Sequence, residues 1–131
     1  MAIAFASALR NTRMDAITTL AGNGALIQIY DGTRPATGGT ATTKLAELTG
    51  ATPFAASSSG GVLTVGTITQ DASANATGTA TWFRVYASNG TTFVMDGNVG
   101  TSGSDLNLTT TSIVSGQPVS ISSFVLTEGN A

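Results

Sequence analysis

The segment from residue 79 to residue 95 most narrowly limits the folds open to this chain. Threonine, β-branched and aromatic residues alternate with other residues over 79–86 and again over 91–95, and Asn89-Gly90 lies between the two runs. An Asn-Gly pair in this setting is the strongest short-range hairpin signal, because a type I′ turn needs positive φ at both central residues. The sequence therefore predicts a β-hairpin.

The two faces of the first hairpin strand carry different side chains. Phe83 and Val85 share one face, whereas Trp82, Arg84 and Tyr86 share the other. Because an unpaired arginine is rarely buried, we expect Phe83 and Val85 to face the core and the other three to lie on the outer face. This outer group is either ordinary cross-strand packing or a contact patch for another subunit, since Trp, Tyr and Arg are enriched in interface hot spots.

Alternation with a period of two recurs along the chain from residue 25 onward. Clusters of Gly, Pro, Asn, Asp and Ser separate the alternating runs and predict turns. The expected strands are residues 25–30, 44–49, 62–69, 79–86, 91–95, 106–108 and 119–127. Short strands at this spacing are typical of a mainly β fold, so we expect one antiparallel β-sandwich or jelly-roll domain over residues 22–131.

Residues 1–21 differ from the rest because their apolar residues recur at spacings of three and four, which predicts an N-terminal α-helix. The helix would stop at Gly22-Asn23-Gly24. It either docks on its own domain or forms a terminal arm that reaches a neighbouring subunit. We do not expect a signal peptide, because the positive charges follow the apolar residues. The apolar residues of the stripe are Phe5, Leu9, Ala16, Ile17 and Leu20.

Charge is scarce, and two reactive residue types are missing. Only 9% of the 131 residues are charged, and the chain has neither Cys nor His. It therefore lacks thiolate nucleophiles, disulfides and the commonest general base and metal ligand. Five scattered cations do not predict a groove that binds nucleic acid. The chain contains no run of 18 apolar residues, so no membrane-spanning helix is predicted. We expect no catalytic residue, metal or cofactor, and no nucleic acid or membrane partner.

The low charge has two interpretations. With a mean hydropathy of +0.23, the chain is either a robust soluble β domain whose surface uses hydroxyl groups or a domain that packs against other chains. The aspartates do not decide between them, because they adjoin turn residues and are expected to cap those turns through their side chains. These residues are Asp31, Asp71, Asp96 and Asp105.

Three stretches of turn and strand sequence carry a resemblance to a known family. They are IYDGTRPATGG at 29–39, GTATWFRV at 78–85 and MDGNVGTSGSDLNL at 95–108, with GQPV at 116–119 near the C-terminus. Together they resemble small proteins encoded in the structural modules of tailed bacteriophages and prophages. Such proteins are similar to the jelly-roll cement, or decoration, proteins that clamp neighbouring subunits on the outside of HK97-type capsids. The motifs contain no catalytic signature.

The resemblance implies a virion protein on the capsid exterior, made in the host cytoplasm. Its partners would be the major capsid protein and further copies of itself, as a homodimer or homotrimer. Neutral strands and exposed strand edges suit that work, because an edge can pair with another chain. The candidate contacts are Phe5, Leu9 and Arg13 on the arm, Arg34 in the loop at 31–43, and Trp82, Arg84 and Tyr86 on the hairpin.

Two other functions compete with this one. A tail- or fibre-associated module could contact host surface sugar by stacking Trp82 and Tyr86 on a sugar ring. A small hydrolase is the third class, which the absence of His and Cys disfavours.

Overall fold

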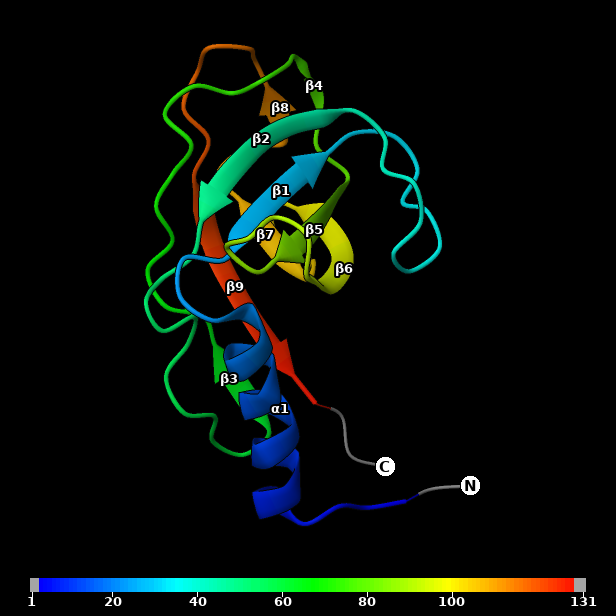
Figure 1. Cartoon of the computed structure of the whole chain (residues 1–131). Coiled ribbons are helices and arrows are strands. Elements are labelled where there is room, and N and C mark those ends of the chain that lie inside the picture. The colour runs from blue at the N-terminus through cyan, green and yellow to red at the C-terminus, as the bar shows by residue number, and fades with distance from the viewer. Residues whose placement is uncertain (1–2, 129–131) are drawn as a thin grey trace.

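The computed structural model describes residues 3–128, which form one helix and nine strands (Figure 1). The helix predicted over 1–21 is present from Ser7 onward, whereas residues 3–6 are not helical and residues 1–2 lie outside the described part. The expected strands are present, although the one at 62–69 is regular only over its first three residues and the one at 79–86 is divided in two. The elements are α1 (Ser7–Ala21), β1 (Leu26–Tyr30), β2 (Lys44–Thr49), β3 (Val62–Thr64), β4 (Gly78–Thr79), β5 (Trp82–Tyr86), β6 (Phe93–Gly100), β7 (Leu106–Leu108), β8 (Ser112–Ile113) and β9 (Ile121–Thr127).

Seven of the strands form one sheet in the order β2-β1-β5-β6-β7-β9-β3, and β4 pairs with β8 separately. Every pair is antiparallel except β6 with β7, which is parallel. The expectation of a wholly antiparallel fold is therefore wrong at this pair. The loop at 101–105 returns the chain to the side of β6 in the same direction, which sequence alternation alone does not reveal. The fold is mainly β, with a curled mixed sheet.

The curl of the sheet brings its two end strands back toward other parts of the chain. Thr49 at the end of β2 exchanges two backbone hydrogen bonds with Thr69, at 3.2 and 2.8 Å. The N–H of Asn75 donates to Leu45 O at 2.7 Å, and Val62 of β3 pairs with Ser59. Both end strands thus have backbone partners on their outer sides, so the expectation of exposed strand edges is wrong for them.

The core lies inside the curl, where three phenylalanine rings meet edge to face. The Phe124 ring is 5.2 Å from the Phe83 ring and 6.3 Å from the Phe54 ring. All three residues are buried, as is Val85. The inward orientation predicted for Phe83 and Val85 is confirmed, because the strand alternates and the inner face carries the apolar side chains.

The hairpin of β5 and β6 is confirmed, but its turn is not the expected type. Only Gly90 of the Asn-Gly pair has a positive φ, and its N–H donates to Ala87 O at 2.9 Å. A register shift follows: Tyr86 pairs with Phe93, whereas Val85 pairs with Met95, which leaves Val94 as the extra residue of a bulge. Because of this extra residue, the β6 side chains after Val94 point to the opposite face of the sheet from the one they would occupy in an unbroken ladder.

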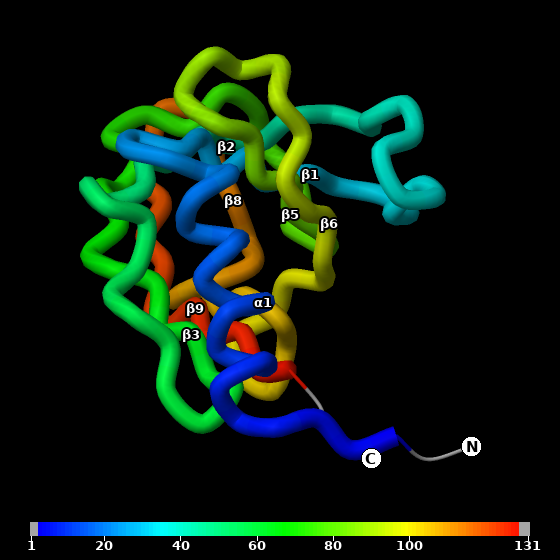
Figure 2. Tube along the Cα trace, turned by 60° about the horizontal axis from the view of Figure 1, so that its bottom comes forward, coloured from blue at the N-terminus to red at the C-terminus, as the bar shows by residue number. Residues whose placement is uncertain are grey.

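Helix α1 crosses the molecule beside β3 and β6 (Figure 2). It ends where expected, because Gly22 adopts φ 68° and its N–H caps the helix by donating to Thr18 O. Met14 and Ala21 are buried, and Ile17 packs against the core. Within residues 3–128, no helix combines the length and apolar character needed to span a membrane.

Candidate interaction surface

Two polar residues of α1, Asn11 and Asp15, face the protein body. Asp15 Oδ1 accepts the N–H of Ser58 at 2.7 Å, and Asn11 Oδ1 accepts the N–H of Gly61 at 2.9 Å. The Ser58 hydroxyl donates to Asn11 O at 2.9 Å. These three bonds hold α1 to residues 58–61, so the helix docks through polar contacts as well as through its three apolar inner residues.

Two arginines join α1 to Glu128, the residue that follows β9. Arg10 Nη2 donates to Glu128 O at 2.6 Å, and Arg13 forms an ion pair with the Glu128 carboxylate. The Arg13 guanidinium also lies 5.1 Å from the centre of the Phe5 ring. The structure therefore brings two predicted contact residues, Phe5 and Arg13, together, and Arg13 remains about half exposed.

The opposite side of α1 carries exposed small and apolar residues, which we call the outer stripe and define as Leu9, Thr12, Ala16 and Leu20. Leu9 is 46% and Leu20 is 50% exposed, and the two small residues between them are exposed as well. Spacings of three and four place the four residues on one helix face. Leu9 was predicted as a contact, whereas the outward direction of Leu20 was not.

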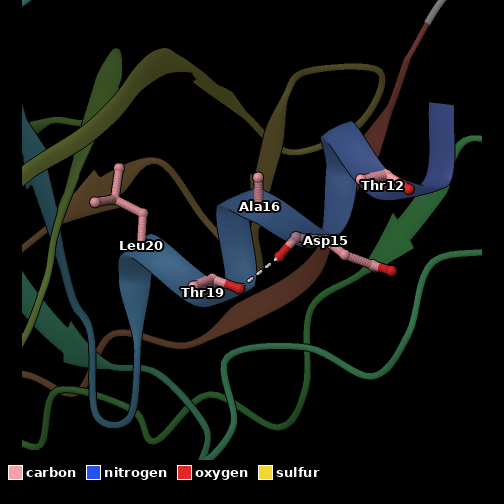
Figure 3. Close-up of a pocket in the computed structure, with 5 residues that line it drawn as sticks. All are labelled: Thr12, Asp15, Ala16, Thr19 and Leu20. Atoms are coloured by element: carbon pink, nitrogen blue, oxygen red, sulfur yellow. Dashed lines mark hydrogen bonds between the residues drawn. The ribbon is translucent and has the colours of Figure 1, made fainter. Parts of the chain in front are cut away.

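The outer stripe borders a hollow of about 580 Å³ that is lined by Thr12, Asp15, Ala16, Thr19 and Leu20 (Figure 3). All five residues belong to α1, and the Thr19 hydroxyl donates within the helix to Asp15 O at 3.3 Å. A hollow lined by a single helix is open on its other sides. It can receive side chains of a partner, but it does not enclose a small molecule.

The predicted outer patch on β5 is buried at two of its three residues. Trp82 is fully buried, stacks on Tyr30 at 4.3 Å, and donates from Nε1 to Asp31 O at 3.0 Å. Arg84 is 3% exposed, and Tyr86 is half-buried. All three do lie on the face opposite the core, but the prediction of an exposed patch is wrong for Trp82 and Arg84. The loop that follows β1 covers this face.

Arg84 can be buried because it has a carboxylate partner. Its Nε and Nη2 donate to the two carboxylate oxygens of Asp96 at 2.6 and 3.1 Å. Hydrogen bonding to Asp96 is the main cause that raises the pKa of Arg84 above its ordinary value, and burial opposes it. The bulge at Val94 places Asp96 directly opposite Arg84. Asp96 therefore does not cap a turn, and the prediction of that role is wrong.

Of the other three aspartates, Asp71 caps its own turn as predicted, whereas Asp31 and Asp105 accept backbone N–H groups 12 and 7 positions away and so do not cap a local turn. Asp71 Oδ1 accepts from Ser73, Asp31 Oδ1 from Thr43, and Asp105 Oδ2 from Asn98, at 3.0, 3.1 and 2.8 Å respectively.

A ladder of polar residues crosses four strands on the outer face. Glu47, Gln28, Arg84 and Asp96 stand opposite one another on β2, β1, β5 and β6. Gln28 Nε2 donates to Glu47 Oε2 at 2.8 Å. We call these four residues the polar ladder. It had no sequence signal of its own, because it depends on the order of the strands and on the bulge.

Arg34 lies in the loop at 31–43, which extends from the sheet in Figures 1 and 2. The residue is exposed, as a contact residue would be. The loop is tied to the polar ladder by one bond, in which the Gly38 N–H donates to Asp96 Oδ2 at 3.0 Å. The structure brings Arg34 together with none of the other six predicted contact residues through any bond described within residues 3–128.

Burial raises the pKa of Tyr30 above its ordinary value of 10.0, and the neighbouring Tyr86 adds to the shift. The folded state therefore holds the phenolic proton more tightly than the unfolded state does. We expect the free energy of unfolding to be unaffected below about pH 10 and to fall as the pH rises beyond it. Urea unfolding between pH 8 and pH 11 tests this, and Tyr30→Phe should flatten the slope. An equally steep slope in that variant would exclude Tyr30 as its source.

Within the part of the chain that the structure describes, no three Asp, Glu, His or Cys residues are arranged to hold a metal ion. Comparison of the chain with family models, curated proteins and solved structures found no match.

Proposed function

We propose that this protein is a structural component of a bacteriophage virion, a cement or decoration protein on the outside of an HK97-type capsid. It would bind the major capsid protein through non-covalent contacts and stabilise the shell by joining neighbouring subunits. Under this proposal the curled β body is related to the jelly roll of such proteins. The resemblance of the turn and strand motifs at 29–39, 78–85 and 95–108 supports the proposal.

The outer stripe of α1 is the observation that carries the proposal. The neighbouring polar residues Asn11 and Asp15 form hydrogen bonds with the protein body, whereas Leu9 and Leu20 are exposed to solvent. An arrangement that serves the isolated chain alone would turn the leucines inward, because burying each would contribute about 1.5–3 kcal/mol. An uncharged stripe also loses little by desolvation when a partner covers it. The stripe therefore suits adhesion within an assembly.

The buried Trp82 weighs against the competing role of a sugar-binding tail module. The Trp82 ring is fully buried, stacks on Tyr30 and lies 5.2 Å from the Arg84 guanidinium, so it has no free face on which a sugar could stack. Tyr86 alone is partly accessible.

We expect virions that carry this protein to contain it in a copy number close to that of the major capsid protein. Each capsid site repeats by icosahedral symmetry, whereas a tail component is present in few copies. Quantitative staining of purified virions gives the ratio, and cryo-electron microscopy gives the location. Density confined to the tail would contradict the capsid role.

The Leu9→Ser/Leu20→Ser variant tests the outer stripe itself. We expect its binding to particles that lack the protein to fall at least about tenfold, since each leucine contributes roughly 1 kcal/mol or more when buried. Val114→Ser is the matched control, because Val114 is similarly exposed, at 48%, but lies after β8. Equal losses in the two variants, or no loss in the first, would place the capsid contact elsewhere.

A further inference from the structure

We infer that Asn23 is a site of spontaneous deamidation, in which its side-chain amide is converted to a carboxylate through a cyclic imide formed with the backbone of Gly24. The inference concerns the chain itself, and it stands or falls without the proposed capsid role. It rests on a comparison of two Asn-Gly pairs, Asn23-Gly24 and Asn89-Gly90, which share a reactive sequence but differ in their structural surroundings.

The reaction needs only water and the two residues themselves. The backbone nitrogen of Gly24 gives up its proton and bonds to Cγ of Asn23, and the Cγ–Nδ2 bond breaks to release ammonia, which carries that proton away. Water then opens the resulting ring at either carbonyl, which leaves aspartate or isoaspartate. Glycine as the second residue favours ring closure, because no side chain shields its nitrogen.

Asn89 is held in its turn by hydrogen bonds at both ends of its amide group. Its Oδ1 accepts the N–H groups of Thr91 and Thr92, each at 2.9 Å, and its Nδ2 donates to Thr92 Oγ1 at 2.8 Å. The attacking nitrogen is engaged as well, because the Gly90 N–H donates to Ala87 O at 2.9 Å. Ring closure at this pair has to break these hydrogen bonds first, and each of them adds to the barrier.

The Asn23 side chain has none of these restraints, because it is exposed and forms no hydrogen bond within residues 3–128. The Gly24 N–H donates to Ala51 O at 3.4 Å, which is a long and weak hydrogen bond. A Cβ built at Gly24 would meet nothing within 4 Å, so there is room for the ring. The buried residues Ala21 and Ala25 hold the connection between α1 and β1 at its two ends, but they leave the Asn23 amide free to turn.

Both asparagines are exposed, so hydrogen bonding rather than contact with water decides which of them reacts. The product at Asn23 adds one negative charge to a chain whose formal net charge is -2. The new charge lies directly after Gly22, whose N–H caps α1, and the negative end of the helix dipole disfavours it there. Deamidation therefore weakens the C-terminal end of α1.

Incubation of the folded protein at mildly alkaline pH, followed by tryptic peptide mapping, tests the inference. Trypsin spares the Arg34-Pro35 bond, so residues 14–44 form one peptide in which Asn23 is the single asparagine. We expect this peptide to gain a carboxylate at least about tenfold faster than Asn89 does, because hydrogen bonds raise the barrier at Asn89. Asn23→Gln should abolish the gain, since glutamine closes the corresponding ring far more slowly.

The matched control is the same incubation in guanidinium chloride at a concentration that unfolds the protein. Unfolding removes the hydrogen bonds of Asn89, and each asparagine is then followed by an unrestrained glycine, so the two rates should converge. Equal rates in the folded protein, or faster conversion of Asn89, would overturn the inference. Conversion of Asn23 only after unfolding would overturn it as well.

Discussion

Asp96→Asn is expected to lower the free energy of unfolding by about 3 kcal/mol, because it leaves a buried arginine without a counter-charge. Arg84 and Asp96 side chains are 4% and 1% exposed, and two hydrogen bonds of 2.6 and 3.1 Å join them. The rings of Trp82 and Phe93, 5.2 and 5.5 Å from the guanidinium, exclude water without replacing the lost charge. Chemical denaturation at neutral pH measures the effect.

The matched control for this variant lies on the same polar ladder. Glu47→Gln removes the charge of an ion pair with Lys44 in which both side chains are about one-third exposed, at a distance of 3.2 Å. Exposed ion pairs contribute roughly 0–1 kcal/mol, so we expect Glu47→Gln to lower the free energy of unfolding by less than about 1 kcal/mol. If the two variants lost equal stability, the Arg84–Asp96 pair would have to be accessible to water, contrary to its burial.

Gly97→Ala is the second change with a large expected effect, a loss of about 2 kcal/mol from overpacking. A Cβ at Gly97 would lie 2.6 Å from Cζ of Phe83, and closer still to its Cε1. The ring cannot simply move away, because it packs against Phe124 at 5.2 Å in the core. Denaturant unfolding of the variant gives the loss.

A compensating change separates steric overlap from any effect of alanine on the β6 backbone. Phe83→Leu removes the edge of the ring that Gly97→Ala would meet, so the double variant should lose at least about 1 kcal/mol less than the sum of the single losses. Strict additivity of the two changes would show that the ring is not the obstacle.

Much of the local structure could be predicted from alternation and turn residues. The pattern of Phe83 and Val85 indicated their inward direction, and residues 44–49 formed the expected strand. What could not be predicted was the environment of the other face. Trp82 and Arg84 share that face as expected, but whether a loop covers it depends on contacts with residues 40 or more positions away, such as Thr42 and Asp31.

The outer stripe of α1 shows the same contrast between what local sequence patterns predict and what tertiary contacts decide. The apolar spacing of residues 1–21 predicted a helix, and it marked Leu9 as a contact residue. The same spacing placed Leu9, Ile17 and Leu20 on one stripe, and that grouping is wrong, because Ile17 packs against the core with Met14 whereas Leu9 and Leu20 are exposed. Which residues face the body was decided by the polar bonds of Asn11 and Asp15 to residues 58–61, which orient the helix about its axis.

By itself, the sequence determined a mainly β chain with an N-terminal helix, poor in charge and without Cys or His, because periodicity and composition are local properties. Only the tertiary structure decided that β6 and β7 run parallel, that a bulge at Val94 turns Asp96 toward Arg84, and that Asn11 and Asp15 of α1 face inward. These outcomes depend on which distant segments meet. A single inserted residue in a strand reverses the faces beyond it, and hydrogen-bond partners can outweigh apolar burial in orienting a helix.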